Sequence, residues 1–141
     1  MRVKEWITPG AETIDPWAPV TEAWSRMRAG GFRRLVVVEG GELVGVVTDR
    51  DLRRARPSEA TTLSAGEAAF LLHRLPVREV MGRPVYAIDE DSPLEAAART
   101  MLNRRIGGLP VIDGRGRLAG VITETDLPRA FVDQARATGG G

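Results

Sequence analysis

The sequence predicts an α/β fold of the α+β kind, in which two tandem β-α-β-β-α units pack with pseudo-twofold symmetry. Residues 45–52 (GVVTDRDL) return at residues 120–127 (GVITETDL). Shorter matches keep the same register further upstream, as when the Ile-Asp pair at residues 14–15 returns at residues 88–89. Each copy also joins short apolar strands to a helical pattern of apolar residues. A duplication of this length predicts two half-modules with related clefts between them.

The elements of the first copy follow from its apolar spacing and its glycines. A short strand at residues 13–15 precedes a helix whose buried face carries Val20, Ala23, Trp24 and Met27. The glycine pair at residues 30–31 is expected to end this helix. Residues 35–38 and 43–47, joined by a glycine-rich turn, predict a β-hairpin. A second helix is expected to open at Thr48.

The second copy repeats this order with clearer helix signals. After a strand at residues 85–89, residues 92–95 (SPLE) predict a capping box with proline at the first helical position. The apolar positions of this helix are Leu94, Ala97, Ala98, Met101 and Leu102, which share one face. Residues 109–112 and 118–122 predict the second hairpin, and a helix is expected to open at Thr123.

These elements divide the chain into four parts. Residues 1–56 form the first domain, residues 57–76 a linker with a short helix, residues 77–136 the second domain and residues 137–141 a flexible, glycine-rich tail. In the linker, residues 64–67 (SAGE) predict a capping box that opens a helix of about ten residues. We expect this helix to dock on the module.

The composition argues against several classes of protein. The 141 residues include 20 basic and 19 acidic side chains, a net charge of +1, which disfavours nucleic-acid or membrane partners held by bulk charge. With no cysteine and one histidine, neither a disulfide framework nor a zinc site is expected. The sequence contains no apolar run of about 18 residues, which a membrane-spanning helix would need, and no signal peptide is recognised. We therefore expect a cytoplasmic protein. No nucleophile–base pair indicates an enzyme.

The repeated Thr-x-x-Asp motif, Thr48 with Asp51 and Thr123 with Asp126, has two compatible interpretations. A threonine N-cap followed by an acid at the third position stabilises a helix start by about 0.5–2 kcal/mol. At the end of an apolar strand, the carboxylate can also accept two hydrogen bonds from the cis-diol of a ribose. The threonine hydroxyl can donate to a phosphate, which a helix N-terminus favours. The glycine that leads each strand, Gly45 or Gly120, lets a partner approach the backbone closely.

Both copies resemble CBS (cystathionine β-synthase-type) domains, and together they resemble a Bateman module. The resemblance rests on residues 3–7, 31–38 and 45–52 in the first copy and on residues 77–81, 105–113 and 120–127 in the second. Residues 58–64 and 70–72 of the linker are similar to the CBS pair of acetoin-utilisation-type proteins, without the ACT domain that those proteins often carry.

The resemblance implies a regulatory module that binds AMP, ADP or ATP, or S-adenosylmethionine or NAD, with no other cofactor, and that forms a homodimer. In such modules the Asp holds the ribose, the Thr lies near the phosphate, and the base lies against the opposite copy. The first cleft would use Thr48 and Asp51, with Ala87, Ile106 and Pro110 around the base. The second would use Thr123 and Asp126, with Ile14, Phe32 and Val36. Arg33 and Arg34 would hold phosphate.

Two hypotheses about function, from different classes, therefore remain. The first is an adenine-nucleotide sensor, and the second is a structural or protein-interaction module, with dimerisation as its role and vestigial clefts. The retention of both aspartates and both threonines favours the sensor. Because Gly107 and Gly108 replace Arg33 and Arg34 in the second copy, the two clefts are expected to be unequal. A single-stranded nucleic-acid binder is disfavoured by the balanced charge.

Overall fold

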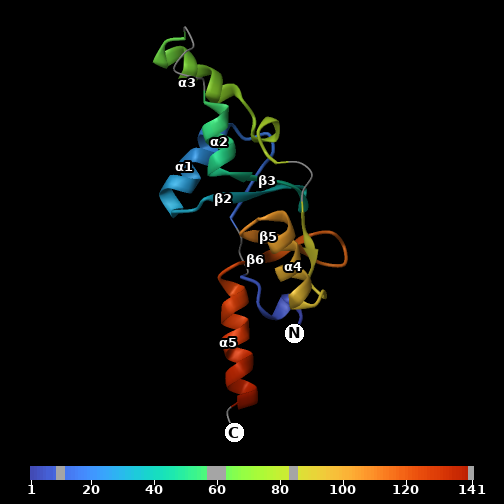
Figure 1. The fold of residues 1–141 in the computed structure, drawn as a ribbon. Helices are drawn as coiled ribbons and strands as arrows, with labels where there is room; N and C mark the ends of the chain where they lie inside the picture. Colours follow the sequence, from blue (N-terminus) through green and yellow to red (C-terminus); the bar gives the residue numbers. More distant parts are fainter. Residues whose placement is uncertain (9–11, 57–62, 83–85, 140–141) are drawn as a thin grey trace. The chain divides into compact units, whose positions relative to one another are not determined.

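The computed structural model describes residues 1–8, 12–56, 63–82 and 86–139, with the side chains of 138 and 139 left out. The chain forms two compact units (Figure 1). We call Glu12–Val85 the first-copy unit. We call Met1–Ala11 together with Tyr86–Gly141 the second-copy unit. The mixed α+β class and the two β-α-β-β-α units predicted from the sequence are confirmed.

The first-copy unit is a three-stranded sheet with helices on it. Its strands are β1 (Thr13–Ile14), β2 (Arg34–Glu39) and β3 (Glu42–Thr48), with β1 parallel and β3 antiparallel to the central β2. The helices are α1 (Val20–Gly30), α2 (Asp49–Ala55) and α3 (Ala65–Arg74), preceding a 3-10 turn at Val77–Glu79. Gly31, with φ of 69°, ends α1 as expected.

The second-copy unit repeats this architecture. It starts with a 3-10 turn at Val3–Glu5, and its strands are β4 (Ile88–Asp89), β5 (Gly108–Ile112) and β6 (Leu118–Thr123), in the same order and directions. Its helices are α4 (Leu94–Arg104) and α5 (Asp126–Gly139). The strand expected at residues 85–89 is shorter, since only Ile88 and Asp89 pair with β5. Residue 85 lies outside the described residues.

The leading segment of each sequence repeat packs on the unit built by the other repeat. The backbone N–H of Val3 donates to Ser92 O (2.9 Å), and the N–H of Val77 donates to Ala18 O (2.8 Å), which is the equivalent bond. Both valines are fully buried in the core of the unit that receives them. Each unit is therefore completed by residues far away in the sequence.

This exchange changes how α4 begins. The predicted capping box at residues 92–95 is wrong, because the N-cap is Pro93 and no side chain caps the helix. The first helical N–H, that of Leu94, donates instead to the carbonyl of Met1 (2.9 Å). The N–H of Val20 in α1 donates likewise to Leu75 (2.8 Å). A backbone carbonyl from the exchanged segment thus satisfies a group that a side chain would otherwise cap.

The last helix differs from its expected bounds at both ends. It begins at Asp126 rather than at Thr123, whereas α2 does begin directly after Thr48. Pro128 gives the reason, because a helix starting at Glu124 would need the N–H that proline lacks and would clash with its ring. At the other end α5 continues to Gly139, so residues 137–139, expected in a flexible tail, are helical. Residues 140–141 lie outside the description.

The linker helix was predicted correctly, but one apolar face was not. The Ser64 side chain accepts a hydrogen bond from the N–H of Glu67 (3.1 Å), and α3 has the expected ten residues. Leu72 and the C-cap residue Leu75 pack against the first-copy core, so the helix docks on that unit. In α4, by contrast, Leu102 is 79% exposed, although the apolar spacing placed it on the buried face.

Gly45 and Gly120, expected to admit a partner, are approached by the exchanged segments of the chain itself. A Cβ at Gly120 would lie 2.8 Å from the backbone oxygen of Thr8, whereas a Cβ at Gly45 would meet the side-chain sulfur of Met81. Backbone cannot move aside as a methionine side chain can.

We therefore expect Gly120→Ala to reduce the free energy of unfolding by about 1–3 kcal/mol, and Gly45→Ala to reduce it less. Urea unfolding of both variants measures the difference. An equal or reversed order would contradict the close approach of Thr8 to Gly120.

Candidate functional site

Thr48 and Asp51 form a reciprocal pair at the start of α2. The Thr48 hydroxyl oxygen accepts a hydrogen bond from the Asp51 N–H (3.1 Å), and Asp51 Oδ2 accepts one from the Thr48 N–H (2.8 Å). This is the predicted capping box. Because the hydroxyl acts as an acceptor here, its own proton remains available to a ligand. Asp51 Oδ1 takes no part in the box, and both residues are half-buried.

The equivalent pair in the second-copy unit is hydrogen-bonded differently. Asp126 is only 5% exposed, and its Oδ2 accepts hydrogen bonds from the Thr123 N–H (2.8 Å) and from the Thr123 hydroxyl (3.0 Å). The Thr123 proton is thus used inside the pair. The two turns therefore share a sequence motif but differ in the donor that they offer.

Arg33 and Arg34 lie beside the Thr48 turn. Arg34 is the cross-strand partner of Thr48, and the N–H of Asp49 donates to the carbonyl of Arg33 (2.9 Å). Both side chains are exposed. Among the described residues no carboxylate forms an ion pair with either guanidinium. The structure thus brings two cations, neither in an ion pair with a described carboxylate, to the turn that holds Thr48 and Asp51.

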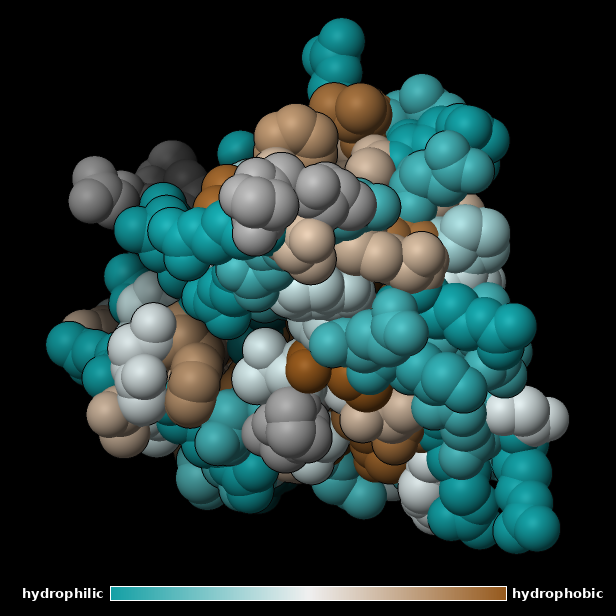
Figure 2. Space-filling view, turned by 90° about the horizontal axis from the view of Figure 1, so that it is seen from below, coloured by the Kyte–Doolittle hydropathy of each residue, from teal (hydrophilic) through white to brown (hydrophobic). Residues whose placement is uncertain are grey.

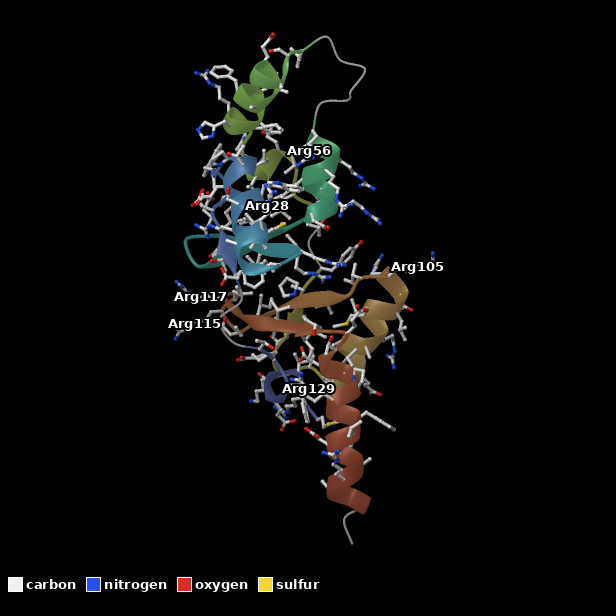
Figure 3. The ribbon with its side chains drawn as sticks, turned by 90° about the vertical axis from the view of Figure 1, so that its left-hand side faces the viewer. Arg28, Arg56, Arg105, Arg115, Arg117 and Arg129 are labelled. Carbon is white, nitrogen blue, oxygen red and sulfur yellow. The ribbon has the colours of Figure 1, made fainter. Side chains whose placement is uncertain are left out.

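Glycines take these two places in the second-copy unit. Gly108 is the cross-strand partner of Thr123, and the N–H of Glu124 donates to the carbonyl of Gly107 (2.9 Å). The backbone arrangement is repeated without the cations. The basic side chain recorded against this turn is Arg129, which is labelled in Figure 3 and which sequence reasoning missed; its guanidinium lies 3.9 Å from Asp126 Oδ1.

The remaining first-copy candidates lie on two sides of their sheet. Ile14 is 3% exposed and belongs to the core beneath the helices. Val36 is also buried, and the alternation along β2 points it to the opposite face from Leu35 and Val37, which are in that core. Phe32 is partly exposed, and its ring lies over Gly30.

The three candidates from the second copy are Ala87, Ile106 and Pro110. Ala87 is exposed, Ile106 packs at the edge of its core, and Pro110 is buried in β5 at the position equivalent to Val36. All three belong to a different unit from Thr48 and Asp51. Their grouping with that pair in one cleft stays a prediction.

Asp49, which the sequence reasoning left out, adds a charge next to Thr48. Its carboxylate is paired with Arg53 one turn along α2. The hydrogen bond from Arg53, helped by the more distant Arg33, holds the pKa of Asp49 below its ordinary value. Asp49 is therefore ionised at neutral pH and balanced by Arg53. The i, i+4 spacing of opposite charges is the sequence signal that identifies this pair.

Within residues 1–8, 12–56, 63–82 and 86–139, no group of histidine, aspartate and glutamate side chains is arranged to hold a metal ion. None of the helices described there combines the length and the apolar character that crossing a membrane requires.

Comparison with known proteins gives the same family twice along the chain. A family model described as the CBS domain matches residues 3–58 and residues 77–133. A CBS domain-containing protein from Dictyostelium discoideum is 34% identical over 126 residues, which is 89% of this chain and 87% of that protein. Protein MJ1225 from Methanocaldococcus jannaschii is 30% identical over 131 residues, but the chain spans only 46% of its length.

Solved structures of CBS pairs are similar over nearly the whole chain. The acetoin-utilisation protein AcuB from Vibrio cholerae has a TM-score of 0.79 at 25% identity, covering 100% of this chain and 97% of its own. CBSX2 in complex with AMP has a TM-score of 0.79 at 26% identity, with 96% and 98% covered. The CBS pair of MJ0100, with 5′-methylthioadenosine and S-adenosylmethionine, has a TM-score of 0.73 at 25% identity, with 95% and 98% covered.

Proposed function

The chain belongs to the CBS domain family, with two such domains in tandem, and from this premise we propose that it is a regulatory module for an adenosine-containing ligand. AMP, ADP or ATP is the proposed ligand, S-adenosylmethionine is the second choice, and no reaction is catalysed. The observation that carries the proposal is the gathering of Asp51, Thr48, Arg33 and Arg34 at one turn of the first-copy unit.

These groups match the parts of a nucleotide. A free carboxylate oxygen on Asp51 can accept hydrogen bonds from a ribose diol, and the Thr48 hydroxyl keeps a proton to donate. A guanidinium offers paired N–H donors to phosphate oxygens, and such charge-assisted bonds are about twice as strong as neutral ones. The positive charge of Arg33 and Arg34 favours a phosphate over an uncharged ligand.

The ligands of similar proteins support the same chemical class. CBSX2 was solved with AMP, and the MJ0100 pair with 5′-methylthioadenosine and S-adenosylmethionine. These ligands share an adenosine moiety and differ in what its 5′ position carries. The diol and the base are thus the parts that a common site would recognise, whereas the arginines would select the 5′ group.

Replacing Arg33 and Arg34 together by alanine should weaken AMP and ATP binding about 10–100-fold, because charge-assisted hydrogen bonds to phosphate are lost. Adenosine, which has no phosphate, should lose much less affinity. Raising the salt concentration should produce the same difference, since it screens exposed charges. Isothermal titration calorimetry with the three ligands measures both effects.

The matched control is Arg115→Ala with Arg117→Ala, which removes two positive charges from the β5–β6 turn of the other unit (Figure 3). This control should leave all three affinities within about twofold of the parent, because neither arginine belongs to the turn that holds Thr48 and Asp51. Equal losses for adenosine and ATP in the Arg33, Arg34 variant would show that these arginines do not face a phosphate.

A second candidate function is favoured by exposed apolar side chains. Leu102 on α4 and Phe131 on α5 are 79% and 72% exposed, and Figure 2 shows hydrophobic side chains at the surface among hydrophilic ones. We propose that these helices pair two copies in a C2 dimer, the commonest oligomer. Sedimentation of the calorimetry samples separates the functions, since an interaction module without a ligand role would give dimers and no nucleotide heat.

A further inference from the structure

We propose that the first-copy unit has a second binding site, a hollow between α1, α2 and α3 that takes a small organic carboxylate with an apolar body. The hollow has a volume of about 200 Å³. Trp24, Leu52 and Leu72 form its apolar wall, and Thr21, Ser25 and Arg56 supply its polar groups. It is independent of the proposed nucleotide function.

The hollow is not a requirement of the fold. In the other repeat the positions equivalent to Trp24 and Arg56 are Ala98 and Phe131, and no helix equivalent to α3 is present in the described part of the second-copy unit. That unit is built on the same strand order and the same helix-side core. The aromatic ring, the cation and the covering helix are therefore additions to one unit only.

Arg56 makes the hollow selective for an anion. Its guanidinium carbon lies 4.5 Å from the centroid of the Trp24 ring. Arg56 is the C-cap of α2 and is labelled in Figure 3. A guanidinium held over a ring face by a cation–π contact still has N–H donors to offer, and their fork matches the two oxygens of a carboxylate. Among the described residues, none that lines the hollow is acidic, and no carboxylate forms an ion pair with Arg56.

The size and the wall define the rest of the ligand. A dry cavity of roughly 150 Å³ can hold a benzene molecule, and sites for drug-sized ligands are roughly 300–1,000 Å³. A volume of about 200 Å³ therefore fits one ring or a short branched chain with its carboxylate, and it is too small for a nucleotide. The indole of Trp24 and the side chains of Leu52 and Leu72 would bury the apolar body. The hydroxyls of Thr21 and Ser25 stand one helical turn apart at the same wall.

The test is a titration of the full chain with phenylacetate, followed by ¹H–¹⁵N NMR. We expect saturable shifts at the amides of α1, α2 and α3 that surround the hollow. Phenylacetamide, which has the same shape without the charge, should bind at least about tenfold more weakly, as should phenethylamine. Arg56→Ala should weaken phenylacetate binding at least about tenfold. The control Arg54→Ala removes the same charge from α2 outside the hollow and should change the affinity less than about twofold.

A filling variant tests the cavity itself without removing a core residue. Ser25 is exposed at the wall, so Ser25→Leu should leave the fold intact and abolish phenylacetate binding. The proposal is overturned if phenylacetate gives no saturable shifts up to about 20 mM, a concentration that would reveal even millimolar affinity. Equal affinity for phenylacetamide, or unchanged binding in Arg56→Ala or in a folded Ser25→Leu variant, would also overturn it.

Discussion

Replacing Val3 by aspartate should reduce the free energy of unfolding by about 3–5 kcal/mol, because it places an unpaired carboxylate in a closed core. Val3 is fully buried among residues of α4, β5, β6 and α5, although it lies near the start of the sequence. A typical domain is stable by only about 5–15 kcal/mol, so much of the margin would be lost. Urea unfolding followed by circular dichroism measures the change.

Two further variants make this test specific. Val77→Asp introduces the same charge into the core of the first-copy unit, where Val77 is also fully buried, and should cost a similar amount. In samples that sediment as monomers, Leu102→Asp makes the same chemical change at a position that is 79% exposed, and should cost less than about 0.5 kcal/mol. If Val3→Asp were as mild as Leu102→Asp in those samples, the exchange of leading segments between the two sequence repeats would be wrong.

Removing the two motif aspartates should abolish nucleotide binding at the proposed sites. Asp51→Ala or Asp126→Ala should weaken binding at its own site about 10–100-fold, as expected when a hydrogen bond to a charged group is lost. The double variant should show no calorimetric signal with AMP or ATP. Unchanged affinity in the double variant, verified as folded, would rule out the proposed diol contact.

The same two substitutions should differ in their effect on stability. Asp51→Ala removes a helix cap from a half-buried turn and should cost about 0.5–2 kcal/mol. Asp126→Ala should cost more, because it leaves both the N–H and the hydroxyl of Thr123 without their acceptor at a nearly closed position. Denaturation of the single variants measures the order. A smaller cost at Asp126 would contradict the hydrogen-bond pattern that distinguishes the two turns.

Local sequence signals predicted the elements whose causes are local. Gly31 ends α1 because the left-handed conformation there suits glycine, and Ser64 opens α3 through its own side chain. Thr48 and Asp51 were predicted as cap and as ligand candidates from four residues, and the cap is present. The start of α5 also had a local cause, the proline at position 128, whose effect the repeat comparison obscured.

The sequence by itself determined the duplicated α+β architecture, the order of elements along each copy and the residues of the Thr-x-x-Asp turns, because these depend on short-range periodicity, turns and repetition. Only the tertiary structure decided which unit receives Val3 and Val77, that Met1 rather than Ser92 satisfies the first N–H of α4, and that Leu102 is exposed. It also decided that Trp24 and Arg56 meet beneath α3. These contacts join segments that are far apart in the chain. The spacing of apolar residues predicts that a face will be buried, but it does not predict which distant segment will cover that face.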